Sequence, residues 1–140
     1  MTPWHAPVDA PFPQVHSLSN GHYSVLITSA GGGYSSWQDM DLTRWRADTT
    51  LDDRGTWITI QDQESGEVWP VGYPVVDSQS HSRHVLFYPH KAEFQCGDHE
   101  IAADMEVAVA PQEDVEIRRI TLTNQSMRRR ELSVTSYGEV

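Results

Sequence analysis

The chain has 140 residues, of which 38% are hydrophobic, and a formal net charge of -10 at pH 7. This length suits one domain that buries roughly 68% of the surface that its unfolded chain would expose. The negative charge would repel a phosphate backbone or an anionic lipid surface, so neither nucleic acid nor a membrane is expected as a direct partner.

The chain begins with a proline-rich stretch. Four prolines lie among the first thirteen residues, and segments of this composition are usually extended and lack a packed core. We therefore assign residues 1–13 to a linker and residues 14–140 to a folded domain. The other end, residues 130–140, stops within a strand-like alternation, which indicates a chain cut from something longer.

Alternation of apolar and polar residues predicts β-strands along the rest of the chain. The predicted strands cover residues 22–29, 56–62, 83–89, 91–97, 100–110, 114–124 and 130–140. Gly, Asn and Asp turns at spacings of roughly ten residues favour an antiparallel sandwich or barrel. We predict the all-β class and an antiparallel β-sandwich. Arg118 and Arg119 interrupt one alternation and suggest a bulge or a change of face, and the basic run 128–130 is interpreted as a solvated turn.

Three glycines at positions 31–33 follow the first of these strands. A nucleotide phosphate loop requires a helix directly after it, because the first turn of the helix supplies oriented N–H groups. The residues after Gly33 show no helical pattern, so that interpretation is poor. Two others stay open. The glycines can form a turn at a strand end, or they can let the backbone approach a ligand beside the hydroxyls of Tyr34 and Ser35.

The residues after the glycines have side chains suited to sugars and phosphate. Aromatic rings stack on the C–H faces of sugars, and guanidinium groups make forked hydrogen bonds to hydroxyls or phosphate. These side chains are Trp37, Asp39, Arg44, Trp45 and Arg46. In a small β domain, however, a Trp is more often part of the core and an Arg near an Asp is more often a surface ion pair. A ligand pocket is therefore a hypothesis.

Other catalytic chemistry has little support. His81, His84, His90 and His99 lack acidic or cysteine partners at ligand spacing, so no metal site is predicted. The single cysteine, Cys96, lacks an activating motif, and no nucleophile elbow is present. One cysteine also excludes an internal disulfide, which fits a reducing compartment. We expect a cytoplasmic location.

Three segments carry a resemblance to a known family: residues 18–46, 66–74 and 113–140. They resemble the N-terminal β-sandwich domain of the glycoside hydrolase family 94 phosphorylases, formerly grouped as glycosyltransferase family 36. The similarity covers residues 15–140. It is greatest to the phosphorylase-like region of cyclic β-1,2-glucan synthases, and cellobiose and chitobiose phosphorylases are more distant.

The resemblance implies both architecture and reaction. Full-length members carry a larger super-sandwich, a helical linker and an (α/α)6 barrel, and they cleave β-glucosidic bonds with inorganic phosphate and inversion. Their catalytic aspartate lies on the barrel, so no catalytic residue is assigned to this chain. No metal and no cofactor is expected, apart from inorganic phosphate as the co-substrate of the full enzyme. The parent protein is expected to be cytoplasmic or attached to the bacterial inner membrane.

The resemblance also implies which residues bind substrate. The family's glycine-tyrosine segment and its downstream arginines match a set that we assign as substrate-binding: Gly32, Gly33, Tyr34, Ser35, Arg44 and Arg46. The leading hypothesis is a fragment of a carbohydrate-active enzyme of the cyclic β-1,2-glucan synthase or β-glucoside phosphorylase type. It would supply a sugar-proximal loop and a packing surface to a barrel of the same or a neighbouring chain. The alternative is a stand-alone, non-catalytic sandwich that binds glucan or a partner domain.

Overall fold

A computed structural model describes residues 2–8, 10–44, 55–72 and 83–140. The described residues form β-strands and connecting turns, and they contain no helix that could span a membrane. The twelve strands are β1 Trp4–Ala6, β2 Val15–Ser19, β3 Tyr23–Thr28, β4 Gly33–Trp37, β5 Met40–Asp41, β6 Trp57–Asp62, β7 Val68–Val71, β8 His84–Tyr88, β9 Lys91–Asp98, β10 Ile101–Val109, β11 Glu116–Asn124 and β12 Leu132–Tyr137.

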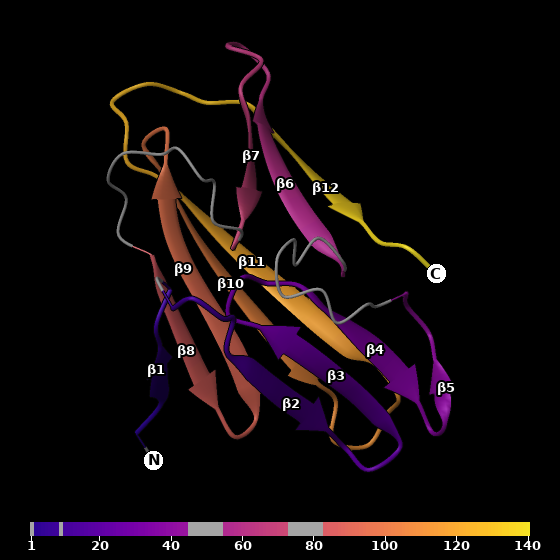
Figure 1. The fold of residues 1–140 in the computed structure, drawn as a ribbon. Helices are drawn as coiled ribbons and strands as arrows, with labels where there is room; N and C mark the ends of the chain where they lie inside the picture. Colours follow the sequence, from indigo (N-terminus) through magenta and orange to yellow (C-terminus); the bar gives the residue numbers. More distant parts are fainter. Residues whose placement is uncertain (1, 9, 45–54, 73–82) are drawn as a thin grey trace.

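The strands form three antiparallel sheets. A five-stranded sheet has the order β1-β8-β9-β10-β11, a four-stranded sheet the order β2-β3-β4-β5, and a three-stranded sheet the order β12-β6-β7. The two smaller sheets lie over one face of the five-stranded sheet, as Figure 1 shows for β2, β3 and β4 in front of β10 and β11. The predicted antiparallel β-sandwich is confirmed.

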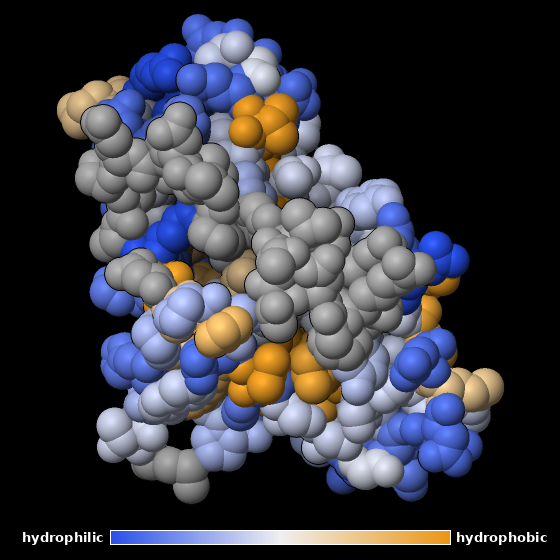
Figure 2. Space-filling view, viewed as in Figure 1, coloured by the Kyte–Doolittle hydropathy of each residue, from blue (hydrophilic) through white to orange (hydrophobic). Residues whose placement is uncertain are grey.

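The core lies between these layers. Along β10 the side chains alternate between buried and half-buried, and Met105 and Val107 are among those on the buried face. They join one hydrophobic cluster with Phe94 of β9, Ile27 of β3 and Ile60 of β6. Full burial of a large apolar side chain stabilises the fold by about 1.5–3 kcal/mol. Apolar residues from all three sheets therefore hold the layers together. On the face seen in Figure 2, hydrophilic residues cover most of the coloured surface, in keeping with the net charge.

The predicted irregularity at Arg118 and Arg119 is wrong. β10 and β11 pair without interruption from Ile101 opposite Asn124 to Val109 opposite Glu116, so β11 contains no bulge. The alternation is broken because Arg118 occupies an inward-facing position. There its guanidinium donates to Glu116 at 2.6 Å and to the carbonyl of Thr56 at 2.9 Å.

Two further expectations differ from the structure. Residues 4–6, predicted to belong to the linker, form β1 and pair with β8. The tilted rings of Trp4 and Phe87, 5.6 Å apart, give this short strand an aromatic contact. The basic run is not a fully solvated turn, because the side chain of Arg130 is 3% exposed and forms an ion pair with Asp62.

Candidate functional site

The glycine run joins β3 to β4, and we call residues 31–35, which include the start of β4, the glycine turn. The carbonyl of Gly32 accepts a hydrogen bond from the N–H of Thr28 at 2.8 Å. Gly31 and Gly33 have φ angles of 97° and 140°, which L side chains rarely adopt. A Cβ at Gly33 would lie 1.9 Å from the carbonyl oxygen of Leu26. Only glycine therefore allows β4 to begin here.

On its other side, the glycine turn lies close to residues at the ends of β6 and β7, and glycines again make this close contact possible. A Cβ at Gly55, just before β6, would lie 2.9 Å from the backbone nitrogen of Gly33. A Cβ at Gly31 would lie 3.6 Å from the ring of Trp57 and 3.8 Å from the backbone of Gly72. The glycine turn thus packs closely beside the three-stranded sheet, backbone against backbone at Gly55 and against the ring of Trp57 at Gly31.

Ser35 is held from the inside of the sandwich. It is 5% exposed, and its hydroxyl donates to Oε2 of Glu116 on β11 at 2.7 Å. Its backbone N–H donates to the hydroxyl of Thr43 at 2.9 Å, and its carbonyl accepts from the N–H of Leu42 at 2.8 Å. Because Glu116 also accepts from Arg118 at 2.6 Å, a charged network fixes the orientation of the Ser35 hydroxyl.

Tyr34 lies on the opposite face of β4 from Ser35, since successive side chains of a strand alternate between faces. It is half-buried, and its cross-strand neighbour is Leu26, which in turn lies opposite Ser17. Ser35 and its network belong to the inner face. Tyr34 therefore belongs to the outer face of the four-stranded sheet.

Trp37 ties the far end of β4 to the five-stranded sheet. Its indole N–H donates to Oδ2 of Asp114 at 2.6 Å, in the turn between β10 and β11. Asn20 supports the same turn, because its side-chain amide donates to the carbonyls of Ala110 and Glu113 at 3.0 and 2.9 Å. The indole N–H of Trp37 is thus engaged in holding the sheets together.

The structure brings four of the predicted substrate-binding residues into the glycine turn: Gly32, Gly33, Tyr34 and Ser35. Arg44 follows β5 with an exposed side chain, and its backbone N–H donates to the carbonyl of Glu139 at 3.0 Å. Arg46 and Trp45 lie outside the described residues. The roles assigned to these residues in substrate binding stay predictions.

Sequence reasoning missed Glu116, which holds the turn from β11. The side chains of Glu116 and Arg118 are 13% and 14% exposed, although both carry a charge. The spacing of two residues between Glu116 and Arg118 could have revealed this pair. It places opposite charges on one face of a strand, and such buried charges are usually paired.

The described histidines and the cysteine form no recognisable reactive centre. His99 pairs with Glu67 at 3.0 Å, and His90 lies beside the ring of Tyr88, whereas His81 is outside the described residues. No group of His, Cys, Asp and Glu among the described residues could hold a metal ion. Burial raises the pKa of the Cys96 thiol, so the reactive thiolate is disfavoured.

Comparison with known proteins shows to which family the chain belongs. The model of the glycosyl hydrolase 94 supersandwich domain matches residues 4–140. The chain belongs to this family. The supersandwich domain is 36% identical over 122 residues to a cyclic beta-(1,2)-glucan synthase NdvB of Rhizobium meliloti, covering 87% of this chain and 4% of the synthase.

Two N,N'-diacetylchitobiose phosphorylases are also similar to this supersandwich domain. The protein of Vibrio proteolyticus is 30% identical and that of Vibrio furnissii 28% identical, each over 139 residues. Each match covers 94% of this chain but 17% of the phosphorylase. The chain therefore spans a small part of the length of these relatives, and the resemblance to family 94 is confirmed.

Proposed function

We propose that this supersandwich domain supplies a sugar-proximal loop and a packing surface to a catalytic barrel on other polypeptide, of the same or a neighbouring chain. The reaction would be inverting phosphorolysis or synthesis of a β-glucoside, with inorganic phosphate as co-substrate. The protein would be located in the cytoplasm or on the cytoplasmic side of the bacterial inner membrane. Membership of the family, with a glucan synthase and two phosphorylases among its relatives, supports this proposal.

The observation that carries the proposal is the fixed backbone of the glycine turn. Gly33 has no room for a side chain, and the Ser35 hydroxyl is bound to Glu116 at 2.7 Å. Tyr34 is thereby presented on the outer face of β4 from a backbone that is set before a sugar arrives. A binding group on a rigid element holds substrate more accurately than one on a mobile loop.

The division of labour follows from the chemistry. Phosphorolysis with inversion needs a general acid to protonate the leaving oxygen, while phosphate attacks from the opposite face of the sugar. We assign the general acid to the barrel. The supersandwich domain would orient the sugar through Tyr34, reach toward its hydroxyls with Arg44 and Arg46, and cover the barrel mouth so that water is excluded.

The first test compares the 140-residue chain with the same domain joined to a family 94 barrel. Both are incubated with phosphate and either a β-1,2-linked glucose oligosaccharide or N,N'-diacetylchitobiose, and the released sugar 1-phosphate is measured. We expect product only when the barrel is present. Product from the 140-residue chain alone would overturn the proposed division of labour.

The second test replaces Tyr34 by phenylalanine in the joined protein. Loss of one hydroxyl that binds sugar should lower kcat/KM about tenfold, the value of roughly one neutral hydrogen bond. Tyr137→Phe is the matched control, because Tyr137 is 58% exposed on β12 and donates to Glu139 at 3.1 Å. Equal kinetics for wild type and Tyr34→Phe would assign Tyr34 a purely structural role.

A further inference from the structure

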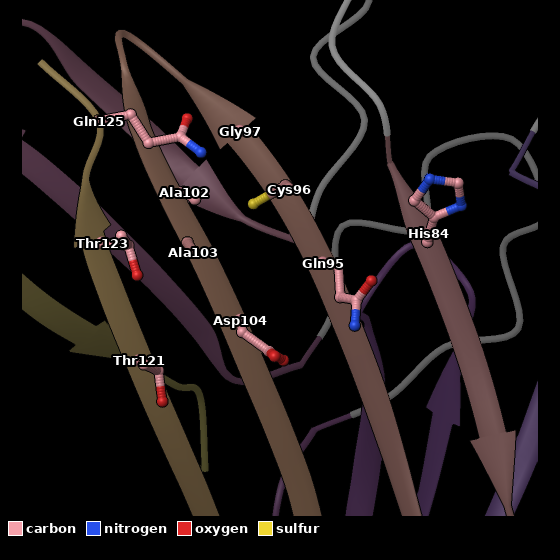
Figure 3. A pocket seen from close by; sticks show the side chains of 10 residues that line it. All are labelled: His84, Gln95, Cys96, Gly97, Ala102, Ala103, Asp104, Thr121, Thr123 and Gln125. Carbon is pink, nitrogen blue, oxygen red and sulfur yellow. The ribbon is translucent and has the colours of Figure 1, made fainter.

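The outer face of the five-stranded sheet carries a depression of about 370 Å³, which we call the outer depression. This volume lies near the lower end of the range of roughly 300–1,000 Å³ that is typical of small-molecule sites. In Figure 3 the side chains of Gln95, Asp104, Thr121 and Thr123 are arranged around it on β9, β10 and β11. The four-stranded sheet packs on the other face of this sheet, so Tyr34 lies on the far side of the sandwich.

Small residues create the outer depression. Gly97 lies directly opposite Ala102, and Thr123 follows Ala102 on the next strand, so this row has little side-chain volume. A Cβ at Gly97 would meet no heavy atom within 4 Å. The depression is therefore open space on the sheet surface, set by the sequence of facing strands.

A row of charged side chains lies beside the depression, and its charges are paired. Lys91 donates to Oε2 of Glu93 at 2.9 Å and also to Glu106. Arg119 donates through Nε to Glu106 at 2.6 Å, and the side-chain amide of Gln95 donates to Glu93 at 2.6 Å. The two basic and two acidic groups of this row offset one another and leave no strong field for an anion or a cation.

Asp104 is the remaining acidic group, and it lines the depression. Its Oδ1 is buried and has no hydrogen-bond partner among the described residues. Burial, reinforced by the nearby carboxylates of Glu93 and Glu106, raises the pKa of Asp104. The carboxyl group of Asp104 offers hydrogen-bond acceptors, and the side chains of Thr121, Thr123 and Gln95 offer both donors and acceptors.

We propose that the outer depression binds a neutral, polyhydroxylated ligand, namely a sugar residue of an oligosaccharide. Its lining offers hydroxyl, amide and carboxyl groups that match the paired donors and acceptors of sugar hydroxyls. The flat floor of Gly97 and Ala102 leaves room for a ring. Because the neighbouring charges of Lys91, Glu93, Glu106 and Arg119 are paired, no strong field attracts an ion to the depression, and the described residues contain no group that could hold a metal. This site is separate from the proposed role of Tyr34.

The test is a titration of the 140-residue chain, followed by NMR of its backbone amides. The probe is a linear β-1,2-linked glucose trisaccharide. We expect saturable shifts at Ala102, Asp104, Thr121 and Thr123 with a Kd on the order of 1 mM. Thr121→Val should raise the Kd about tenfold, because it keeps the shape of the strand but removes a hydroxyl. Gly97→Val should abolish the shifts by filling the depression.

Matched variants separate loss of the site from loss of the fold. Thr135→Val changes an exposed threonine on β12, outside the depression, and Gly97→Ala leaves most of the depression open. Both should bind like the wild type, and the amide spectrum of each variant reports whether it is folded. Shifts at the outer depression are followed separately from any shifts on the Tyr34 face, so failure of the enzymatic role would leave this result unaffected.

Three results with the wild-type chain would overturn the proposal. The first is the absence of saturable shifts in the folded wild-type chain. The second is shifts confined to the Tyr34 face. The third is stronger shifts at the depression from calcium chloride, inorganic phosphate or a neutral serine-rich peptide than from the trisaccharide. Unchanged binding by a folded Gly97→Val variant would equally exclude the outer depression as the site.

Discussion

Replacing Gly33 by alanine is expected to unfold the domain or to lower its free energy of unfolding by more than about 3 kcal/mol. The added Cβ would lie 1.9 Å from the carbonyl oxygen of Leu26, at a φ of 140° that also strains any L residue. The clash involves backbone atoms, so no side-chain rotation relieves it. β3 and β4 would have to separate where Ile27 lies opposite Gly33, and Ile27 is fully buried.

Two other glycines provide graded controls for this measurement. Gly21 has a φ of 96° but open space around its Cβ position, so Gly21→Ala should cost about 1 kcal/mol through backbone strain alone. Gly97 has open space and no positive φ, so Gly97→Ala should change stability by about 0.5 kcal/mol or less. Urea unfolding measures all three variants. If the Gly33→Ala protein were as stable as the Gly21→Ala protein, the backbones of Gly33 and Leu26 would not be in close contact.

Replacing Arg130 by alanine should have the second-largest effect and lower Tm by roughly 10 °C. The guanidinium of Arg130 is 3% exposed, donates to Oδ2 of Asp62 at 2.7 Å and donates to the carbonyl of His99 at 2.8 Å. Its removal leaves the buried carboxylate of Asp62 without its counter-charge. Desolvation of an unpaired charge costs much more than loss of a pair exposed to water.

Arg128→Ala is the matched control, since it removes the same side chain from the same segment. Arg128 and its partner Glu64 are 53% and 72% exposed at a distance of 3.3 Å, and such pairs contribute about 0–1 kcal/mol. Its Tm should therefore stay close to that of the wild type in a thermal melt followed by circular dichroism. Equal melting temperatures for the two variants would show that Arg130 is solvated after all.

The pH dependence of this pair has a defined sign. The backbone N–H groups of Glu64 and Ser65, followed by Arg130, lower the pKa of Asp62 in the folded state. A lowered pKa gives stability that is present above the ordinary pKa of aspartate and is lost as the pH falls through the folded value. The difference in Tm between wild type and Arg130→Ala should therefore narrow in acid, because protonated Asp62 no longer needs a counter-charge.

Strong alternation made most of the strands predictable from the sequence. The run 100–110 predicts β10 within one residue at each end, because a strand with one buried face has an apolar residue at every second position. β4 was not predicted, since Gly33, Ser35 and Ser36 have little intrinsic preference for a strand. β3 supplies the hydrogen-bonding partner that makes this segment a strand.

The contacts that shape the candidate site were less predictable, because their partners are distant in the sequence. Ser35 is bound by Glu116, 81 residues away, and Arg130 by Asp62, 68 residues away. A local pattern can show that a residue is polar, but it cannot show which polar group the fold places beside it. The interpretation of the basic run as a solvated turn failed at Arg130 for this reason.

The shared carboxylate of Glu116 determines how the glycine turn can behave. One oxygen holds Ser35 of the four-stranded sheet, the other holds Arg118, and Arg118 reaches the carbonyl of Thr56 just before β6. Displacing the turn would break charged contacts to two other sheets at once. The glycine turn is therefore expected to stay fixed relative to both of these sheets, because it cannot shift without breaking the contacts of Glu116 and Arg118.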